Sequence, residues 1–280
     1  MPSGFTRESS LNNYLLIVFD SCRYDSFTAA RPRHMKKLGR VERRWSYASW
    51  TAPSHFNLLT GLLPHSSPKR VWASEYYKAD FLKFNERLGG TGIDFGTLGP
   101  ALYLPPFLQR IGYATHARVS LPVLNEHTIL NTGFDSYRLM PAHNDFAAIL
   151  QEVRFREDKP SFYLLNVGET HYPYALAGEP PDRWPKISGV HGVFKRWNAK
   201  TPAIRMFNPA KMAELRERQI EAVRFLDGAI ERLLDTVPRN TYITITSDHG
   251  ELFGEDGYFG HGPVYHPTVF EVPFLEGKLR

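Results

Sequence analysis

The sequence Thr-Ile-Thr-Ser-Asp-His-Gly-Glu at residues 244–251 decides the fold class. Residues 242–246 are rich in β-branched side chains and predict a strand, which stops at two ligand-type residues, Asp248 and His249. Gly250 permits the sharp turn that follows. In an open α/β sheet, ligands bind in the crevice beyond the carboxyl ends of the strands. Asp-His pairs also occur in ordinary turns, so this interpretation depends on other segments that end in the same way.

Two more apolar runs end at acidic residues. Residues 14–19 (Tyr-Leu-Leu-Ile-Val-Phe) have the continuous apolar character of a strand that is buried on both faces of a parallel sheet, and Asp20 follows directly. Residues 161–167 form a similar run that leads to Glu169. Taken alone, Asp20 fits a helix cap as well as a metal ligand, and the parallel with Asp248 favours the ligand. The pattern predicts an α/β fold with a central, mostly parallel sheet flanked by helices.

The clearest predicted helix covers residues 211–237, where apolar residues recur at three- and four-residue steps. It leads into the strand that precedes Asp248, as a crossover helix does. Further helices are expected at 103–111 and 144–156, and further strands at 41–48 and 113–119. Residues 64–101 and 176–209 match no such pattern and are predicted to be insertions within one catalytic domain that spans residues 1–280.

Residues 49–61 (Ser-Trp-Thr-Ala-Pro-Ser-His-Phe-Asn-Leu-Leu-Thr-Gly) predict a short helix with Thr51 at its start. Pro53 suits the first turn of a helix and Gly61 suits its end. The free N–H groups and the dipole of a helix N-terminus favour an anion, so the Thr51 hydroxyl would be placed to attack a phosphate held there. The alternative is that Thr51 is an ordinary N-cap residue.

The composition is that of a soluble globular protein: 42% of the 280 residues are hydrophobic and 22% are charged. The net charge of +5 indicates an anionic substrate or a mildly basic surface. Basic residues form no stripe interleaved with aromatic ones, so no nucleic acid partner is expected. The one cysteine, Cys22, excludes an internal disulfide and fits a reducing compartment. We interpret it as a buried structural thiol.

The first apolar run, residues 14–19, is too short to span a bilayer, and the residues before it are polar. We therefore expect a cytoplasmic protein with no membrane partner. The sequence makes no prediction of the oligomeric state.

Residues 51–61 resemble the nucleophile motif of the alkaline phosphatase superfamily. Sulfatases in that superfamily carry Cys-x-Pro-Ser-Arg there, and the cysteine is converted to formylglycine. Nucleotide pyrophosphatase/phosphodiesterases carry Thr-x-Pro-x-His followed by Leu-Thr-Gly. Thr51 and His55 match the second branch, and Cys22 is not at the formylglycine position. Residues 19–25 likewise resemble the Phe-Asp-Gly-x-Arg-x-Asp of the phosphodiesterases.

Two further stretches extend the resemblance. Ser-Asp-His-Gly-Glu at 247–251, followed by a glycine-rich loop and His261-Gly262, is similar to the pattern of phosphoethanolamine transferases. Residues 169–174 resemble the Asp-x-His-x-Pro-Tyr of sulfatases, whereas the Pro-Asp-x-x-Gly-His of the phosphodiesterases is absent. The resemblance implies an alkaline-phosphatase-like three-layer sandwich. Because the chain ends soon after residues 272–275, we expect it to lack the C-terminal subdomain of full-length sulfatases.

The resemblance also implies a divalent metal cofactor, Zn²⁺ or Mn²⁺, with one or two ions. The first ion would be held by Asp20, Thr51, Asp248 and His249. A second would be held by Glu169, His171 and His261. Without the second ion, the two histidines would donate hydrogen bonds or act as general acid.

Thr51, His171 and His261 are thus the predicted catalytic residues, with Thr51 as the nucleophile. The residues expected to contact a small anionic phosphate-ester substrate are Arg23, His55, Lys69 and Arg70. The expected activity is that of a metal-dependent phosphohydrolase that cleaves a phosphate mono- or diester through a phospho-threonine. Alternatives are transfer to an alcohol, hydrolysis of a sulfate or phosphonate ester, and a non-catalytic metal-binding module.

Overall fold

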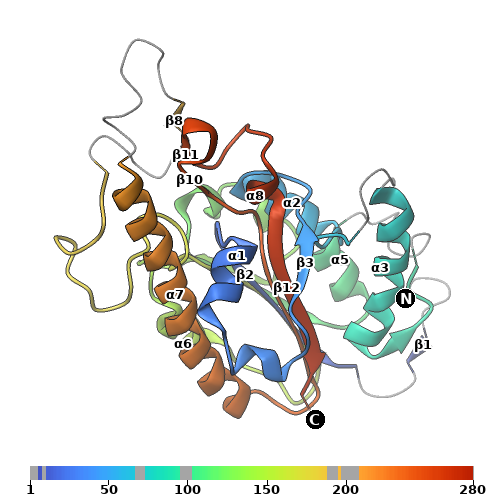
Figure 1. Ribbon diagram of the computed structural model, residues 1–280. Coiled ribbons are helices and arrows are strands. Elements are labelled where there is room, and N and C mark those ends of the chain that lie inside the picture. Colours follow the sequence, from blue (N-terminus) through green and yellow to red (C-terminus); the bar gives the residue numbers. More distant parts are fainter. Residues whose placement is uncertain are drawn as a thin grey trace.

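The computed structural model describes residues 6–7, 11–66, 73–94, 103–187, 195–196 and 208–279. A central sheet lies between two layers of helices (Figure 1). Its seven strands are ordered β3-β12-β9-β2-β7-β5-β6. Their bounds are β2 (Asn13–Phe19), β3 (Glu42–Trp45), β5 (Ala114–Val119), β6 (Ser136–Leu139), β7 (Ser161–Val167), β9 (Thr241–Ser247) and β12 (Glu271–Lys278).

The middle of the sheet is parallel. Strand β2 pairs in parallel with β9 on one side and with β7 on the other, and β7-β5-β6 continue in parallel. Only β12 runs antiparallel to its neighbours, β9 and β3. All residues of β2, β7 and β9 are buried. The structure thus confirms the predicted α/β fold with a mostly parallel sheet.

Helices cover both faces of the sheet (Figure 1). Helices α1 (Tyr24–Ala30), α6 (Phe146–Glu152) and α7 (Pro209–Thr236) lie on one side, and α2 (Thr51–Leu59), α3 (Ala73–Leu88) and α5 (Leu104–Arg110) lie on the other. Successive residues of a strand point to opposite faces. Accordingly, Ile17 and Phe19 join the core under α7, whereas Leu16 and Val18 join the core under α2 and α3.

The remaining elements are short. Two small sheets contain β1 (Thr6–Arg7) with β4 (Gly90–Thr91), and β10 (Leu252–Phe253) with β11 (Tyr258–Gly260) and β8 (Lys195–Arg196). The other helical turns are α8 (Pro267–Phe270) and the 3₁₀ helices η1 (Met35–Lys37), η2 (Pro122–Leu124), η3 (Ile129–Asn131) and η5 (Glu255–Gly257). No helix among the described residues is both long enough and apolar enough to cross a bilayer.

The segment 64–101, predicted to be an insertion, contributes α3 to the helical layer. Phe81, Phe84 and Leu88 are buried in the core on the α2 side of the sheet. Arg87 is fully buried and forms an ion pair with Glu276 of β12, with 2.8 Å between Nε and Oε2. The helical period escaped detection because lysine and tyrosine residues interrupt the apolar positions. Residues 67–72 and 95–102 of this segment lie outside the described residues.

Candidate metal centre and active site

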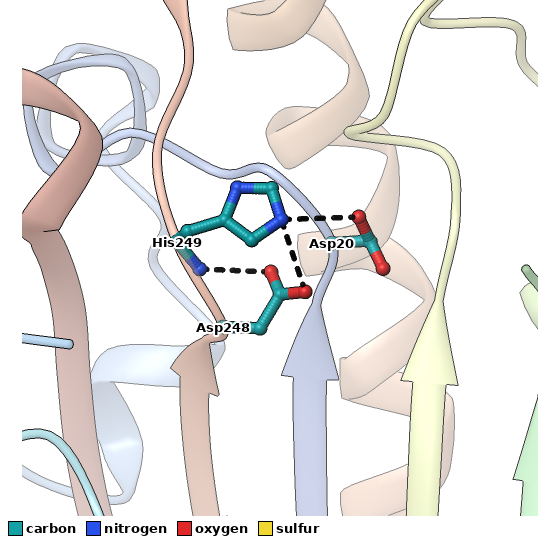
Figure 2. Close-up of side chains that lie close together, drawn as sticks. All are labelled: Asp20, Asp248 and His249. Carbon is teal, nitrogen blue, oxygen red and sulfur yellow. Dashed lines mark hydrogen bonds and ion pairs between the residues drawn. The ribbon is translucent and has the colours of Figure 1, made fainter. Parts of the chain in front are cut away.

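The candidate metal centre lies at the carboxyl ends of the two central strands, β2 and β9. Their parallel register places Phe19 opposite Ser247, so the residues that follow each strand are neighbours. Asp20 follows β2, and Asp248 and His249 follow β9. One ligand atom from each of these three buried residues lies within 4.8 Å of the others (Figure 2). His249 Nε2 is 3.3 Å from Asp248 Oδ2 and 4.0 Å from Asp20 Oδ1.

Thr51 adds a hydroxyl group to this cluster from the other layer of the fold. It is the first residue of α2 and is only 5% exposed. Its Oγ1 donates to Asp20 Oδ1 at 3.4 Å and lies 3.3 Å from His249 Nε2. The structure therefore brings together the four residues that were predicted to surround the first metal ion.

The protonation of His249 is set by its backbone contact. Its Nδ1 lies 2.8 Å from the carbonyl oxygen of Gly250. A carbonyl only accepts hydrogen bonds, so Nδ1 carries the hydrogen and the lone pair of Nε2 faces Asp20, Asp248 and Thr51. Burial and the neighbouring His261 hold the pKa of His249 well below its ordinary value. A neutral imidazole with a free Nε2 is the form that binds a metal.

Each carboxylate has one oxygen held by the protein and one oxygen directed at the cluster. Asp248 Oδ1 accepts from the backbone N–H groups of Ser21 at 3.0 Å and His249 at 2.9 Å. Asp248 Oδ2 is buried and accepts no hydrogen bond from the described residues. His249 Nε2, 3.3 Å away, carries no proton to donate to it. Asp20 Oδ2 accepts from the side-chain amide of Asn166 at 2.9 Å, and its Oδ1, which accepts from the hydroxyl groups of Ser21 at 3.2 Å and Thr51 at 3.4 Å, faces the cluster.

The electrostatics fit a divalent cation. Burial and the adjacent Asp20 raise the pKa of Asp248 well above its ordinary value, because two carboxylates in a dry site repel each other. Burial acts in the same direction on Asp20, but the net shift of its pKa is downward, and the nearby His171 is the largest influence in that direction. Two carboxylate oxygens, one imidazole nitrogen and one hydroxyl form a donor set suited to Zn²⁺ or Mn²⁺.

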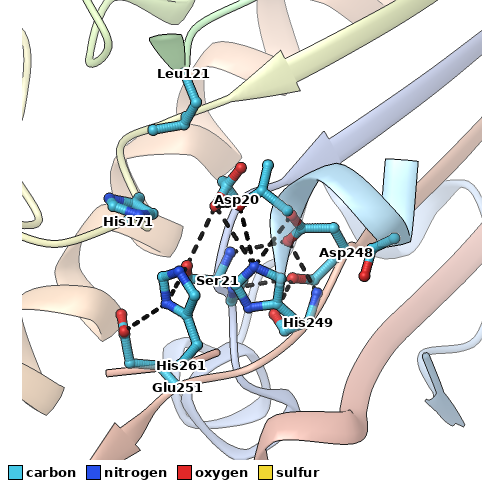
Figure 3. Close-up of polar contacts among 12 residues, drawn as sticks. Asp20, Ser21, Leu121, His171, Asp248, His249, Glu251 and His261 are labelled. Carbon is cyan, nitrogen blue, oxygen red and sulfur yellow. Dashed lines mark hydrogen bonds and ion pairs between the residues drawn. The ribbon is translucent and has the colours of Figure 1, made fainter. Parts of the chain in front are cut away.

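Two further histidines lie beside this cluster (Figure 3). The ring of His261 is 4.3 Å from that of His249 and 5.3 Å from that of His171, measured between centroids. His261 Nδ1 lies 2.9 Å from Glu251 Oε1, and His171 Nδ1 lies 2.8 Å from the carbonyl oxygen of Tyr172. Burial acts to lower the pKa of His261, but the hydrogen bond to Glu251 outweighs it and the net shift is upward. In both histidines Nε2 is the nitrogen left for a ligand.

The sulfatase family model matches residues 12–275, which is almost the whole chain. This chain belongs to the sulfatase family. It is 23% identical over 285 residues to the low-salt glycan biosynthesis sulfotransferase Agl7 of Haloferax volcanii, in an alignment that covers 97% of this chain and 55% of that protein. The chain thus spans about half the length of this relative.

Solved structures of low sequence identity share the fold of this sulfatase-family chain. The C-terminal periplasmic domain of EcEptC from Escherichia coli, in complex with Zn, matches with a TM-score of 0.59 and 15% identity over 99% of this chain and 76% of that one. The corresponding domain of the phosphoethanolamine transferase EptC from Campylobacter jejuni matches with a TM-score of 0.54 and 13% identity over 99% and 81% of the two chains. These similarities show that this chain and the two EptC domains share the same overall fold.

The three residues predicted to bind a second ion do not all lie together in this sulfatase-family structure. His171 and His261 adjoin the cluster, but Glu169 points to the start of α6, where its Oε1 accepts from Phe146 N at 2.7 Å. The next side chain, Thr170, points the other way and donates to the Asp20 carbonyl at 2.7 Å. Burial raises the pKa of Glu169 to about 7. Among the described residues, Glu169 belongs to no group of metal-ligating side chains.

The predicted substrate contacts also differ from expectation. Arg23 is 6% exposed, and its guanidinium is engaged by Asp25 at 2.7 Å and Glu255 at 2.6 Å, so the protein itself neutralises this cation. His55 is 1% exposed and donates from Nδ1 to the Thr51 carbonyl at 2.9 Å, a contact that orients the first turn of α2. Lys69 and Arg70 lie outside the described residues.

Three polar residues near the centre were not predicted from the sequence: Ser21, Asn166 and Glu251. Asn166 was detectable, since it is an amide within the otherwise apolar run 162–167. Glu251 belongs to the motif that precedes the glycine-rich loop, and its second oxygen accepts from Tyr174 Oη at 2.9 Å. Ser21 carries no comparable signal in the sequence; its backbone N–H donates to Asp248 Oδ1, and its hydroxyl donates to Asp20 Oδ1 at 3.2 Å.

Proposed function

We propose that this chain is a metal-dependent enzyme that cleaves a phosphate mono- or diester through a covalent intermediate on Thr51. The observation that carries the proposal is the position of Thr51 Oγ1, which lies 3.3–3.4 Å from His249 and Asp20 at the N-terminus of α2. A hydroxyl group in this position adjoins both a cation site and the N–H groups that favour an anion.

The first step joins Thr51 to the phosphoryl group. The Thr51 hydroxyl releases its proton to solvent, its Oγ1 attacks phosphorus, an Oγ–P bond forms, and the P–O bond to the leaving alcohol breaks. A threonine hydroxyl is a weak nucleophile until it loses its proton. A divalent cation held by Asp20, Asp248 and His249 would supply the positive charge that favours the ionised hydroxyl and offsets charge on the phosphoryl oxygens.

His261 and His171 act on the leaving oxygen and on the phosphoryl oxygens, respectively. The Glu251 carboxylate holds His261 by Nδ1 at 2.9 Å, which leaves Nε2 to protonate the departing oxygen. His171 is held by its own Nδ1 and presents Nε2 to the phosphoryl oxygens. In the second step, water attacks phosphorus, the Oγ–P bond breaks, and the Thr51 hydroxyl is restored.

A second candidate function is transfer of the group to an alcohol. It uses the same intermediate, with an acceptor hydroxyl in place of water, and is favoured by the relatives whose names describe transferases. A sulfuryl group is also a candidate for the transferred group, since the relative from Haloferax volcanii is named a sulfotransferase.

The experiment compares the wild type with Thr51→Ala after loading with Zn²⁺ or Mn²⁺. Turnover of p-nitrophenyl phosphate, bis-p-nitrophenyl phosphate and p-nitrophenyl sulfate is measured with and without glycerol as acceptor, and the acid-quenched protein is searched by mass spectrometry for a modified Thr51. Thr60→Ala is the matched control, because Thr60 directly follows the last residue of α2 and its hydroxyl donates to the Asn57 carbonyl at 2.8 Å.

We expect turnover of a phosphate ester, a phosphorylated Thr51 peptide, and loss of both in Thr51→Ala with the metal content retained. Turnover that persists in Thr51→Ala excludes the covalent mechanism. No turnover of any of the three esters by the metal-loaded wild type favours a non-catalytic metal-binding module.

A further inference from the structure

We infer that Asn166 is a positioning residue, which orients Asp20 and His55 around the candidate metal centre; the inference rests on the proposed metal dependence. Asn166 lies on β7, the direct neighbour of β2, and is fully buried. It precedes Glu169, a predicted metal ligand, by three positions, and among the described residues it makes no hydrogen bond to Thr51 or Asp248.

The orientation of the Asn166 amide follows from its backbone partners. Its Oδ1 lies 3.0 Å from Ser120 N and 3.3 Å from Leu121 N, in the loop that follows β5. Backbone N–H groups only donate, so this atom must be the oxygen. The NH₂ group is then the part that faces Asp20 Oδ2 at 2.9 Å and His55 Nε2 at 3.3 Å.

The two contacts of this NH₂ group have separate consequences. The hydrogen bond to Asp20 Oδ2 restrains rotation of the carboxylate, so that Oδ1 remains directed at Thr51 and His249. Asp20 therefore offers a cation one oxygen and not two. The contact with His55 requires an unprotonated Nε2, so the hydrogen is on Nδ1, where it bonds to the Thr51 carbonyl at 2.9 Å.

One amide thus contacts both groups: it holds Asp20 Oδ2 while the Ser21 hydroxyl holds Oδ1, and it supports the His55 tautomer that donates to the Thr51 carbonyl. Replacing a residue that orients a metal ligand in this way typically lowers metal affinity by about 10- to 100-fold. A purely structural asparagine would affect only the stability of the fold. The distinction is testable because the chain contains a matched residue elsewhere.

Asn13 is that matched control. It is 4% exposed and also links β2 to β7, since its Oδ1 accepts from Ser161 N at 2.8 Å. Its Nδ2 donates to Asn240 Oδ1 at 3.2 Å. It lies at the first residue of β2, whereas Asp20 follows the last, so the length of the strand separates it from the metal centre.

The experiment measures Zn²⁺ affinity, by competition with a chromophoric chelator, and urea unfolding of the metal-free protein. The variants are Asn166→Ala, Asn166→Asp and Asn13→Ala. Asn166→Asp is nearly isosteric and keeps an oxygen for Ser120 N and Leu121 N, but it places a second oxygen against Asp20 Oδ2. This variant keeps the test valid if Asn166→Ala does not fold.

We expect both Asn166 variants to lose about 10- to 100-fold in Zn²⁺ affinity. Asn13→Ala should bind Zn²⁺ as the wild type does, although its metal-free form is destabilised. Wild-type affinity in Asn166→Asp overturns the inference and leaves the proposed function standing. A wild type that binds neither Zn²⁺ nor Mn²⁺ overturns both.

Discussion

The Oγ1 atom of Thr51 lies 3.3 Å from Nε2 of His249, although 198 positions separate the two residues in the chain. His249 reaches this point from the carboxyl end of β9, and Thr51 reaches it from the N-terminus of α2. The contact therefore joins the sheet to one of the helical layers that cover it. Several properties of the protein should depend on this junction.

Asp248→Asn should stabilise the metal-free protein while removing its response to Zn²⁺. The new amide keeps an oxygen for Ser21 N and His249 N, and its NH₂ group can donate to His249 Nε2, 3.3 Å from the present Oδ2. The substitution also removes the electrostatic repulsion between the Asp248 and Asp20 carboxylates, which further stabilises the metal-free protein. We expect an increase of about 1 kcal/mol in the free energy of unfolding, measured by urea titration with a chelator present.

The wild type should instead gain stability when Zn²⁺ is added, because a ligand that binds only the native state shifts the unfolding equilibrium. Asp158→Asn serves as the control for loss of a surface carboxylate, since the side chain of Asp158 is 62% exposed. An Asp248→Asn protein that Zn²⁺ still stabilises would contradict the assigned role of Asp248.

The buried Arg87–Glu276 pair should make stability fall in acid. Burial acts to raise the pKa of Glu276, but Arg87 outweighs it and the net shift is downward. A carboxyl group with a depressed pKa in the folded state stabilises the protein above its unfolded pKa, about 4.3, and this contribution is lost as the pH falls through the folded pKa. At pH 7, Glu276→Gln should cost about 3–5 kcal/mol, because Arg87 is left unpaired.

Urea unfolding at a series of pH values measures this effect. The difference in stability between wild type and Glu276→Gln should shrink below about pH 4. Asp158→Asn removes one partner of an ion pair with Arg156 whose two side chains are more than half exposed, and should change stability little at any pH. If the difference in the free energy of unfolding between wild type and Glu276→Gln stays constant across pH, the ion pair is not the cause of that difference.

Gly250→Ala should destabilise the protein and weaken metal binding together. A Cβ atom at Gly250 would collide with the backbone carbonyl of Thr268, which has no flexible end to move aside. The Gly250 carbonyl also accepts from His249 Nδ1, so a shift of the backbone displaces the ligand. We expect a loss of about 1–3 kcal/mol, measured by thermal or urea unfolding, and a weaker Zn²⁺ affinity.

Gly228→Ala is the opposite control. Gly228 lies inside α7, and an added Cβ there meets nothing within 4 Å. Alanine in an open helix interior should stabilise the protein by about 0.5–1 kcal/mol. Equal effects of the two alanine substitutions would refute the steric explanation.

Glu251→Gln should lower turnover and shift its pH dependence. The hydrogen bond to Glu251 holds the pKa of His261 above its ordinary value, and a neutral amide in its place removes this support. A general acid must be protonated to act, so the alkaline limb of the kcat profile should move to lower pH. We expect kcat to fall about 10-fold or more with KM little changed.

Tyr174→Phe provides the comparison for Glu251→Gln, because it removes the hydrogen bond to Glu251 Oε2 and leaves the bond between Glu251 and His261 intact. Its effect on kcat should be smaller. An unshifted alkaline limb in Glu251→Gln would assign the general acid to another group.

Much of the fold follows from local patterns. Strand β2 could be predicted because its residues are buried on both faces, so they form an unbroken apolar run. Helix α7 could be predicted because one stripe faces the core, and the predicted bounds of 211–237 differ by only one or two residues from Pro209–Thr236. Helix α3 was missed because lysine and tyrosine residues interrupt its apolar pattern, and because its buried Arg87 is paired with Glu276 of β12, which the local sequence does not reveal.

The sequence by itself determined which ligand-type residues stand where the strands end and where α2 begins, because strand length and helix start are encoded by neighbouring residues. Only the tertiary structure decided the direction of each side chain. It turned Glu169 toward α6, paired Arg23 with Asp25 and Glu255, and left Asp248 Oδ2 without a hydrogen-bond donor among the described residues. Asp25 is a neighbour of Arg23 in the sequence, but Glu255 and the Phe146 N–H that Glu169 meets come from distant parts of the chain, so these contacts form only in the folded protein.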